Sequence, residues 1–137
     1  MEEGYPGNLN IYVTYTLTDN NELKVEYEAK TDKTTLINPT QHSYFNLSGE
    51  SSGDVLDHLL VLNADNYLPV NKKIIPTGEI RSVEGTPFDF RERKKIGRDL
   101  NENDDQLDLG NGYDHCWVLN DYGKGLRKSV RYSAKIQ

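Results

Sequence analysis

The residues best suited to proton transfer gather in the segment Asn38–Leu47. His42 stands there among amide and hydroxyl side chains, and two adjacent aromatic residues, Tyr44 and Phe45, follow closely. Histidine titrates near neutral pH and can therefore give or take a proton during a reaction. Polar side chains at this density are costly to bury unless they bond to one another or to a ligand. A single histidine in a polar loop also fits a purely structural role, and the residues alone leave both interpretations open.

A second polar cluster combines two glycines with an aspartate. Gly110 and Gly112 let the backbone turn sharply, and Asp114 follows at the expected start of a strand. A carboxylate in that place can accept two hydrogen bonds from vicinal hydroxyl groups, while Tyr113 or Trp117 can cover the apolar face of a sugar. The alternative interpretation is a glycine turn that leads into a core strand containing Trp117.

Metal and disulfide chemistry find little support in the residues. His42, His58 and His115 are not spaced like a zinc-binding pair on one element, and the single cysteine, Cys116, excludes an internal disulfide and a multi-cysteine zinc site. The stretch that begins at Asp99 imitates a calcium loop but lacks its turn glycine and its final glutamate. We expect no metal, and we expect His58, which precedes a buried strand, to have a structural role.

Length and charge narrow the class of protein. The chain has 137 residues, the usual size of one domain, and carries a net charge of −6 from 16 basic and 22 acidic residues. This balance argues against a nucleic-acid-binding protein, which needs a basic face. No apolar run is long enough to span a membrane, and Met1 opens no signal peptide, so we expect no membrane association and a cytoplasmic location.

Short strands are the elements that must position these residues. Residues 9–17 and 23–29 alternate between apolar and polar side chains on either side of Asp19, Asn20 and Asn21, a pattern typical of a β-hairpin. Further strands are predicted for residues 34–37, 58–64, 80–84, 115–119 and 126–136. Many short strands with Gly, Pro and Asn turns favour an all-β antiparallel sandwich or barrel.

Only one helix is predicted. Asp89 and Glu92 have the spacing of a capping box, and Ile96 and Leu100 share a helical face. The acidic residues 101–108 are predicted to form a polar loop.

Several stretches taken together resemble the aldose 1-epimerases, also called galactose mutarotases. The similar segments follow the family's order and are EEGYPGNLNIYVTYTL (2–17), NPTQHSYFNLSG (38–49), ADNYLPVNKKIIPTGEI (64–80), GTPFDFR (85–91) and GNGYDHCWVL (110–119). The resemblance spans nearly the whole chain. It implies an antiparallel β-sandwich of the galactose mutarotase type, of which these 137 residues form a single, incomplete portion.

The resemblance also implies an activity. The family interconverts the α and β anomers of aldoses such as galactose and glucose by acid/base opening of the sugar ring, without a metal or organic cofactor. The histidine of the HSYFNL motif, the family's general acid, falls on His42. The aspartate of the GYDH motif, which binds sugar hydroxyls, falls on Asp114.

The resemblance covers only the middle of the family's sequence. The family's glutamate base lies in a C-terminal region, and a further histidine and an arginine lie in an N-terminal region, all outside these 137 residues. We therefore expect a truncated chain that is inactive or weakly active. The alternative is a non-catalytic carbohydrate-binding module on the same fold, or one that self-associates, since uncovered strand edges and apolar faces favour homo-oligomers.

Overall fold

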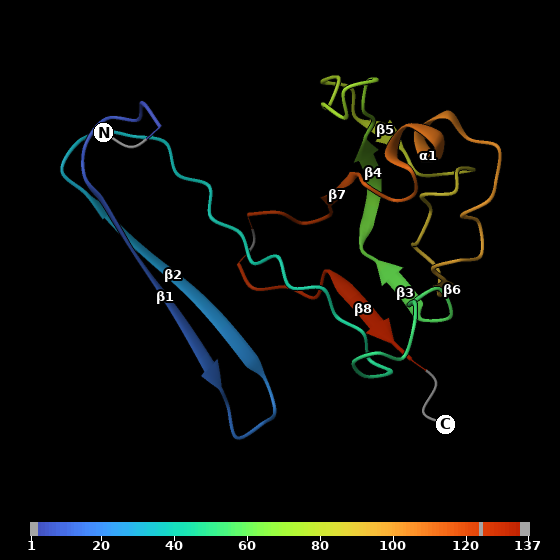
Figure 1. Cartoon of the computed structure of the whole chain (residues 1–137), viewed down its shortest axis with the longest axis horizontal. Helices are drawn as coiled ribbons and strands as arrows, with labels where there is room; N and C mark the ends of the chain where they lie inside the picture. Colours follow the sequence, from blue (N-terminus) through green and yellow to red (C-terminus); the bar gives the residue numbers. More distant parts are fainter. Residues whose placement is uncertain (1–2, 124, 135–137) are drawn as a thin grey trace. The chain divides into compact units, whose positions relative to one another are not determined.

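The structure is a computed structural model that describes residues 3–123 and 125–134 (Figure 1). The chain divides into two compact units, residues 1–44 and residues 45–137. Every paired strand in either unit is antiparallel, and one six-residue helix is assigned in the described part of the chain. The predicted all-β antiparallel class is confirmed. No helix among these residues is long and apolar enough to cross a membrane.

The first unit is a β-hairpin followed by an irregular segment. β1 (Leu9–Leu17) pairs with β2 (Leu23–Thr31) in continuous register, from Leu9 opposite Thr31 to Leu17 opposite Leu23. Asn21 adopts a left-handed backbone with φ of 60°, which asparagine tolerates in a tight turn. The predicted hairpin is confirmed, whereas the short strand predicted for residues 34–37 does not form.

One face of the hairpin is apolar except for Thr31, which lies opposite Leu9. Residues that lie opposite each other in a ladder point to the same side, so the register places on one face Leu9, Ile11, Val13, Tyr15, Leu17, Leu23, Val25, Tyr27 and Ala29. These side chains remain accessible to solvent, with Ile11 44% and Leu17 77% exposed. A two-stranded hairpin is only marginally stable alone. Packing of this face against other apolar groups would therefore stabilise the hairpin.

The second unit contains two three-stranded sheets. One has the order β6-β3-β8, with β6 (Lys94–Lys95), β3 (Leu59–Leu62) and β8 (Val130–Ser133). The other has the order β5-β4-β7, with β5 (Arg81–Ser82), β4 (Ala64–Leu68) and β7 (Cys116–Leu119). Only Asn63 separates the two central strands, β3 and β4. The apolar run that predicts a single strand over residues 58–64 therefore contributes a strand to one sheet and the first residue of a strand to the other. The strands predicted at 80–84 and 115–119 form as β5 and β7.

The strand predicted for residues 126–136 is shorter in the structure. It forms β8, and positions 135–136 lie outside the described residues.

Aromatic rings fill the core of the second unit. Tyr67 and Phe88 stack with ring centroids 4.5 Å apart, and Val83 and Leu107 complete a buried cluster around them. Phe90 belongs to a neighbouring cluster with Leu62 and Ala64. Trp117 packs against both clusters, so the segment around Phe88 and strand β7 share one core.

The helix predicted between Asp89 and Leu100 is wrong, and the Asp89 carboxylate expected to cap it pairs with the Arg91 side chain. The Asp89 carboxylate accepts hydrogen bonds from the backbone and guanidinium of Arg91, and the segment instead forms β6 and turns.

The predicted acidic loop instead contains α1 (Asp105–Gly110). Asp104 caps this helix by accepting from the backbone N–H groups of Gln106 and Leu107, and acidic residues in the first turn suit the helix dipole.

Candidate functional site

His42 lies near the end of the first unit, in the irregular segment that follows the hairpin. Its side chain is exposed, and its ring centroid lies 5.0 Å from that of Tyr44. The neighbouring Gln41 accepts a hydrogen bond from the Tyr15 hydroxyl at 3.0 Å and donates one to Ser43 Oγ at 2.7 Å. These bonds attach the flank of His42 to β1 and leave the imidazole accessible to a ligand.

Asp114 lies in the second unit, on a turn shaped by unusual backbone angles. Asn111 ends α1 in the left-handed region with φ of 50°, and Gly112 follows with φ of 120°, a value that favours glycine. The Asp114 N–H donates to the Gly112 carbonyl oxygen at 3.1 Å. The turn presents an exposed carboxylate two residues before β7, as a hydroxyl-binding role requires.

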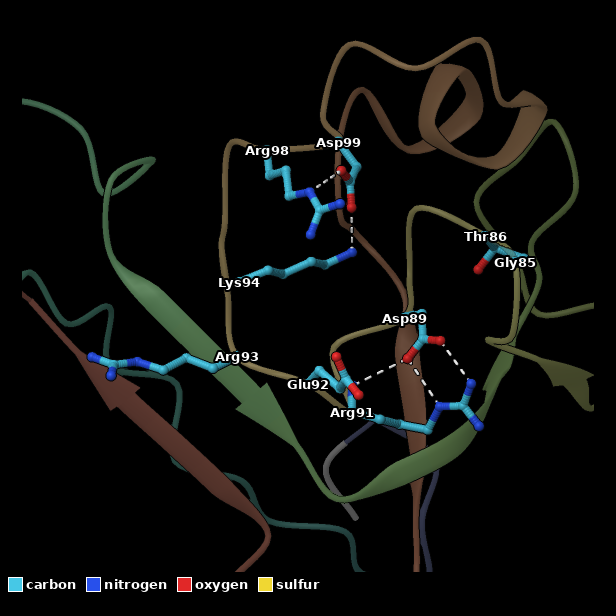
Figure 2. A pocket seen from close by; sticks show the side chains of 9 residues that line it. All are labelled: Gly85, Thr86, Asp89, Arg91, Glu92, Arg93, Lys94, Arg98 and Asp99. Atoms are coloured by element: carbon cyan, nitrogen blue, oxygen red, sulfur yellow. Dashed lines mark hydrogen bonds and ion pairs between the residues drawn. The ribbon is translucent and has the colours of Figure 1, made fainter.

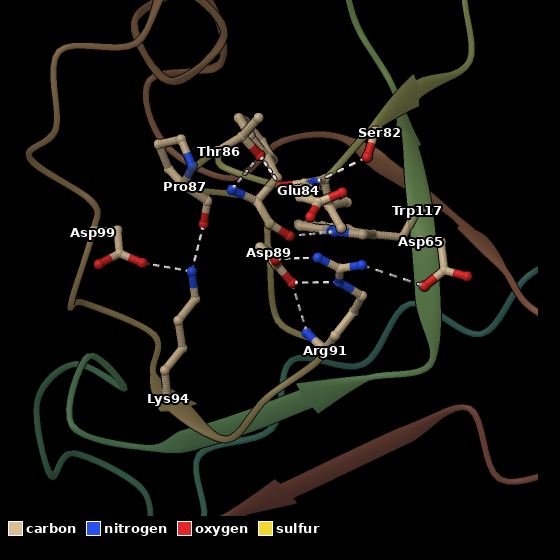
Figure 3. Close-up of polar contacts among 12 residues, drawn as sticks. Asp65, Ser82, Glu84, Thr86, Pro87, Asp89, Arg91, Lys94, Asp99 and Trp117 are labelled. Carbon is tan, nitrogen blue, oxygen red and sulfur yellow. Dashed lines mark hydrogen bonds and ion pairs between the residues drawn. The ribbon is translucent and has the colours of Figure 1, made fainter.

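The aromatic neighbours of Asp114 belong to the core. Tyr113 donates its hydroxyl to the Pro87 carbonyl oxygen at 3.2 Å, and Trp117 donates its indole N–H to the Phe88 carbonyl oxygen at 3.0 Å (Figure 3 shows the latter bond). Burial raises the pKa of the Tyr113 phenol well above its ordinary value, with nearby acidic groups adding to the rise. For these two residues the structural interpretation therefore holds, and Asp114 is the side chain of this cluster that is exposed.

A buried glutamine that the sequence did not single out supports the same turn. Gln106 on α1 is 4% exposed, and its Oε1 accepts from the Val70 N–H at 2.7 Å and lies 3.3 Å from His115 Nε2. The His115 ring also meets Tyr67 and Phe88 edge-on. No periodicity or motif marks a lone glutamine in an acidic stretch, so only the folded chain reveals this contact.

His58 is structural, as expected. It is 3% exposed, and its ring stacks on Tyr132 of β8 with centroids 5.0 Å apart and an interplanar angle of 18°. Its backbone carbonyl accepts from the Ile96 N–H, which ties the segment before β3 to the turn after β6. It therefore offers no exposed group to a substrate.

One pocket of about 500 Å³ lies beside the segment that joins β5 to α1, and Figure 2 shows its charged lining. Arg91 pairs with Asp89 through two hydrogen bonds, and Arg98 pairs with Asp99 at 3.2 Å. Lys94 is 7% exposed. It donates to the Pro87 carbonyl oxygen and to Asp99 (Figure 3).

The Lys94 ammonium also lies 4.2 Å from the centre of the Phe90 ring. The ion pairs and this cation–π contact hold the segment in place. No group of three or more metal-ligating side chains occurs among the described residues.

Burial lowers the pKa of His115 below its ordinary value, although Asp114 and Asp104 oppose the shift. The folded state thus binds a proton at His115 less readily than the unfolded state does. The contribution of His115 to the free energy of unfolding is therefore constant above about pH 6.5 and declines as the pH falls further. We expect the urea midpoint to drop more between pH 7.5 and pH 5 in the wild type than in His115→Phe, which keeps a ring but cannot titrate. An equal drop in both proteins would contradict this prediction.

The Arg91 guanidinium lowers the pKa of the Asp89 carboxyl, so the contribution of Asp89 to stability is lost at more acidic pH than that of His115.

Comparison with known proteins identifies one family that matches nearly the whole chain. The family described as aldose 1-epimerase matches residues 1–135. Galactose mutarotase from Bos taurus is 46% identical over 135 residues, which are 98% of this chain and 36% of that protein. Aldose 1-epimerase from Escherichia coli K12 is 46% identical over 126 residues, 92% of this chain and 36% of that protein.

A solved structure matches the fold as well as the sequence. The galactose 1-epimerase from Lactobacillus acidophilus superimposes with a TM-score of 0.84 at 42% identity, covering 95% of this chain and 37% of that chain. The chain thus spans about 36% of the length of the curated relatives described here. Its strands match part of a galactose 1-epimerase fold, in agreement with an incomplete β-sandwich. From the family match and these identities together, the chain belongs to the aldose 1-epimerase family.

Proposed function

We propose that these residues supply the sugar-binding aspartate and the general acid of an enzyme that interconverts the anomers of hexoses such as galactose or glucose. The observation that carries the proposal is the turn before β7, where a chain of the aldose 1-epimerase family presents the exposed Asp114 carboxylate. The 137 residues then supply two functional groups of that enzyme, one from each unit.

Each proposed residue has a separate chemical task. His42 donates a proton to the ring oxygen of the sugar, so that the C1–O5 bond breaks and the open-chain aldehyde forms. A base outside these 137 residues takes the proton from the C1 hydroxyl. Asp114 accepts hydrogen bonds from sugar hydroxyls and holds the substrate while the C1–C2 bond rotates. The ring then closes on the other face of the carbonyl, and the protons return.

The isolated 137-residue segment is expected to be a poor catalyst. Loss of a general base costs on the order of 10²–10⁴ in rate, and loss of groups that orient the sugar adds to that cost. Polarimetry of freshly dissolved α-D-galactose tests this expectation, with the aldose 1-epimerase of Escherichia coli as the positive control. A turnover rate close to that of the control would overturn the requirement for a base outside the segment.

Sugar binding tests the role of Asp114, which the enzyme proposal shares with the second candidate, a non-catalytic carbohydrate-binding or self-associating module. We expect Asp114→Asn to weaken galactose binding about tenfold, the loss of one charge-assisted hydrogen bond. His42→Asn should weaken it less, because its proton is needed in ring opening. Isothermal titration of both variants measures this difference. Equal affinity of Asp114→Asn and the wild type would refute the role of Asp114.

The exposed apolar face of the β1–β2 hairpin is the observation that favours self-association. Sedimentation at several concentrations tests it, with Val13→Lys as the disrupting variant. A monomer at every concentration would refute the self-associating module and leave the enzyme proposal standing.

A further inference from the structure

Two contacts on the His115 imidazole link α1 to the residue before β7, and a third comes from a core ring. His115 Nε2 lies 3.3 Å from Gln106 Oε1. At the adjoining Cε1 atom, a Cβ built on Gly110 would lie 2.9 Å away, closer than real side chains approach. The ring also lies edge-on to Phe88 with centroids 4.6 Å apart. The imidazole is therefore held by a hydrogen bond, by a backbone and by a core ring at once.

The hydrogen bonds of Gln106 determine which nitrogen of His115 carries the proton. The Val70 backbone N–H can only donate, so the atom of Gln106 that faces it at 2.7 Å is the carbonyl oxygen. The same oxygen faces His115 Nε2, which must then be the donor. His115 Nδ1 is left unprotonated, and it is a buried atom with no hydrogen-bond partner among the described residues.

We propose that His115 is a positioning residue, held as the neutral Nε2–H tautomer between Gln106 and Gly110, and that it fixes the place of the Asp114 carboxylate. This inference rests on the proposed role of Asp114 in binding sugar hydroxyls. His115 directly follows Asp114 in the chain, so a shift of its ring moves the turn that carries the carboxylate. Misplacement by about 1 Å can cost on the order of 100-fold when a substrate must be held precisely.

The half-buried ring of His115, with its buried Nδ1 atom, agrees with this role better than with direct contact to a sugar. Phe88 and Tyr67 cover its ring, and adding a proton at Nδ1 would place a charge where no described acceptor lies. The lowered pKa of His115 follows from the same burial. Asp104 and Asp114 are the charged groups that act on it, and neither forms a hydrogen bond to the ring among those described.

The test uses the whole 137-residue chain and two variants of Gln106. Gln106→Glu keeps an oxygen acceptor for both donors, whereas Gln106→Leu keeps the size of the side chain and removes the acceptor. Long-range ¹H–¹⁵N NMR of the histidine rings at pH 7.5 is expected to show the Nε2–H tautomer of His115 in the wild type and in Gln106→Glu. It should show a mixture of tautomers in Gln106→Leu. Asp108→Asn, on the exposed side of α1, is the matched control and should leave the spectrum of His115 unchanged.

Galactose binding by the same proteins supplies the second measurement. We expect Gln106→Leu to bind about tenfold more weakly at a temperature where it is fully folded, and Gln106→Glu to recover most of the affinity. The backbone amide signal of Asp114 should shift in Gln106→Leu and stay in place in Asp108→Asn. A purely structural role would lower the melting temperature of Gln106→Leu without changing the tautomer or the affinity of the folded protein.

The outcomes distinguish this inference from the proposed function. An Nδ1–H tautomer in the wild type, or an unchanged Asp114 signal in Gln106→Leu, overturns the inference whether or not galactose binds. If galactose binding requires Asp114 but is equal in the wild type and Gln106→Leu, the inference fails and the function stands. If the wild type binds no galactose while tautomer and Asp114 signal change as expected, the positioning role stands and the function fails.

Discussion

Replacing Phe88 by alanine is expected to lower the free energy of unfolding of the second unit by about 3–5 kcal/mol, the usual cost of emptying a buried aromatic site. The Phe88 side chain is fully buried and stacks on Tyr67. Its ring also meets the edges of Tyr113 and His115 and lies 5.9 Å from Trp117. No single neighbour can move into the space without breaking another of these contacts. The loss is therefore a large share of the 5–15 kcal/mol by which a domain is usually stable.

Urea unfolding measured by tryptophan fluorescence tests this prediction, because Trp117 is the only tryptophan of the chain and lies in the same core. Phe45→Ala is the matched control, since Phe45 is 60% exposed and its removal leaves no buried cavity. We expect a change of less than about 1 kcal/mol for Phe45→Ala. Similar losses for the two variants would show that the ring cluster around Phe88 does not hold the second unit together.

Strands with a strict period of two were predictable from the sequence. In residues 9–17 every second side chain is apolar, and the register of β1 with β2 follows this alternation in every pair except Leu9–Thr31. The apolar run before Ala64 correctly indicated a strand, but it did not reveal that Asn63 divides the run between two sheets. Periodicity specifies a face of a strand, whereas the choice of sheet depends on partners distant in sequence.

The two errors in the helical region have a common physical cause. Asp89 has the spacing of a helix cap, but an arginine two residues on offers its carboxylate a bidentate partner. Asp104 lies in a stretch whose composition indicates a loop, but it caps α1 because Leu107 can bury its side chain in the core. In both segments, competition between local hydrogen bonds and tertiary packing determines whether a helix forms.

The sequence located Asp114 better than it located the surroundings of Asp114. The two glycines correctly predicted a sharp turn before a strand, and Gly112 with its φ of 120° confirms why glycine is favoured there. Gly110 has a different role, which is to give room to His115. Tyr113 and Trp117 looked equally fit for a sugar or for a core, and long-range bonds to carbonyls of residues 87 and 88 place them in the core. Such contacts leave no local signal in the sequence.

Replacing His42 by asparagine is expected to have the largest effect on catalysis, and it is best measured in a complete enzyme. The galactose 1-epimerase of Lactobacillus acidophilus matches 95% of this chain at a TM-score of 0.84, so residues 3–134 can replace the corresponding segment of that protein. If His42 is the general acid, His42→Asn in this chimera should lower kcat by about 10²–10⁴-fold, the usual contribution of a positioned proton donor. KM should change little, because asparagine keeps a polar side chain but cannot deliver the proton to the ring oxygen.

Tyr44→Phe is the matched control for this experiment. Tyr44 is 90% exposed, its ring lies beside that of His42, and the substitution removes only a hydroxyl group. We expect kcat of this variant within about twofold of the unmodified chimera, since no proton transfer depends on that hydroxyl. Because a general acid acts in the transition state, its loss must appear in kcat and in kcat/KM together. A His42→Asn chimera that keeps its kcat and loses only affinity would make His42 a binding residue and move the search for the proton donor elsewhere.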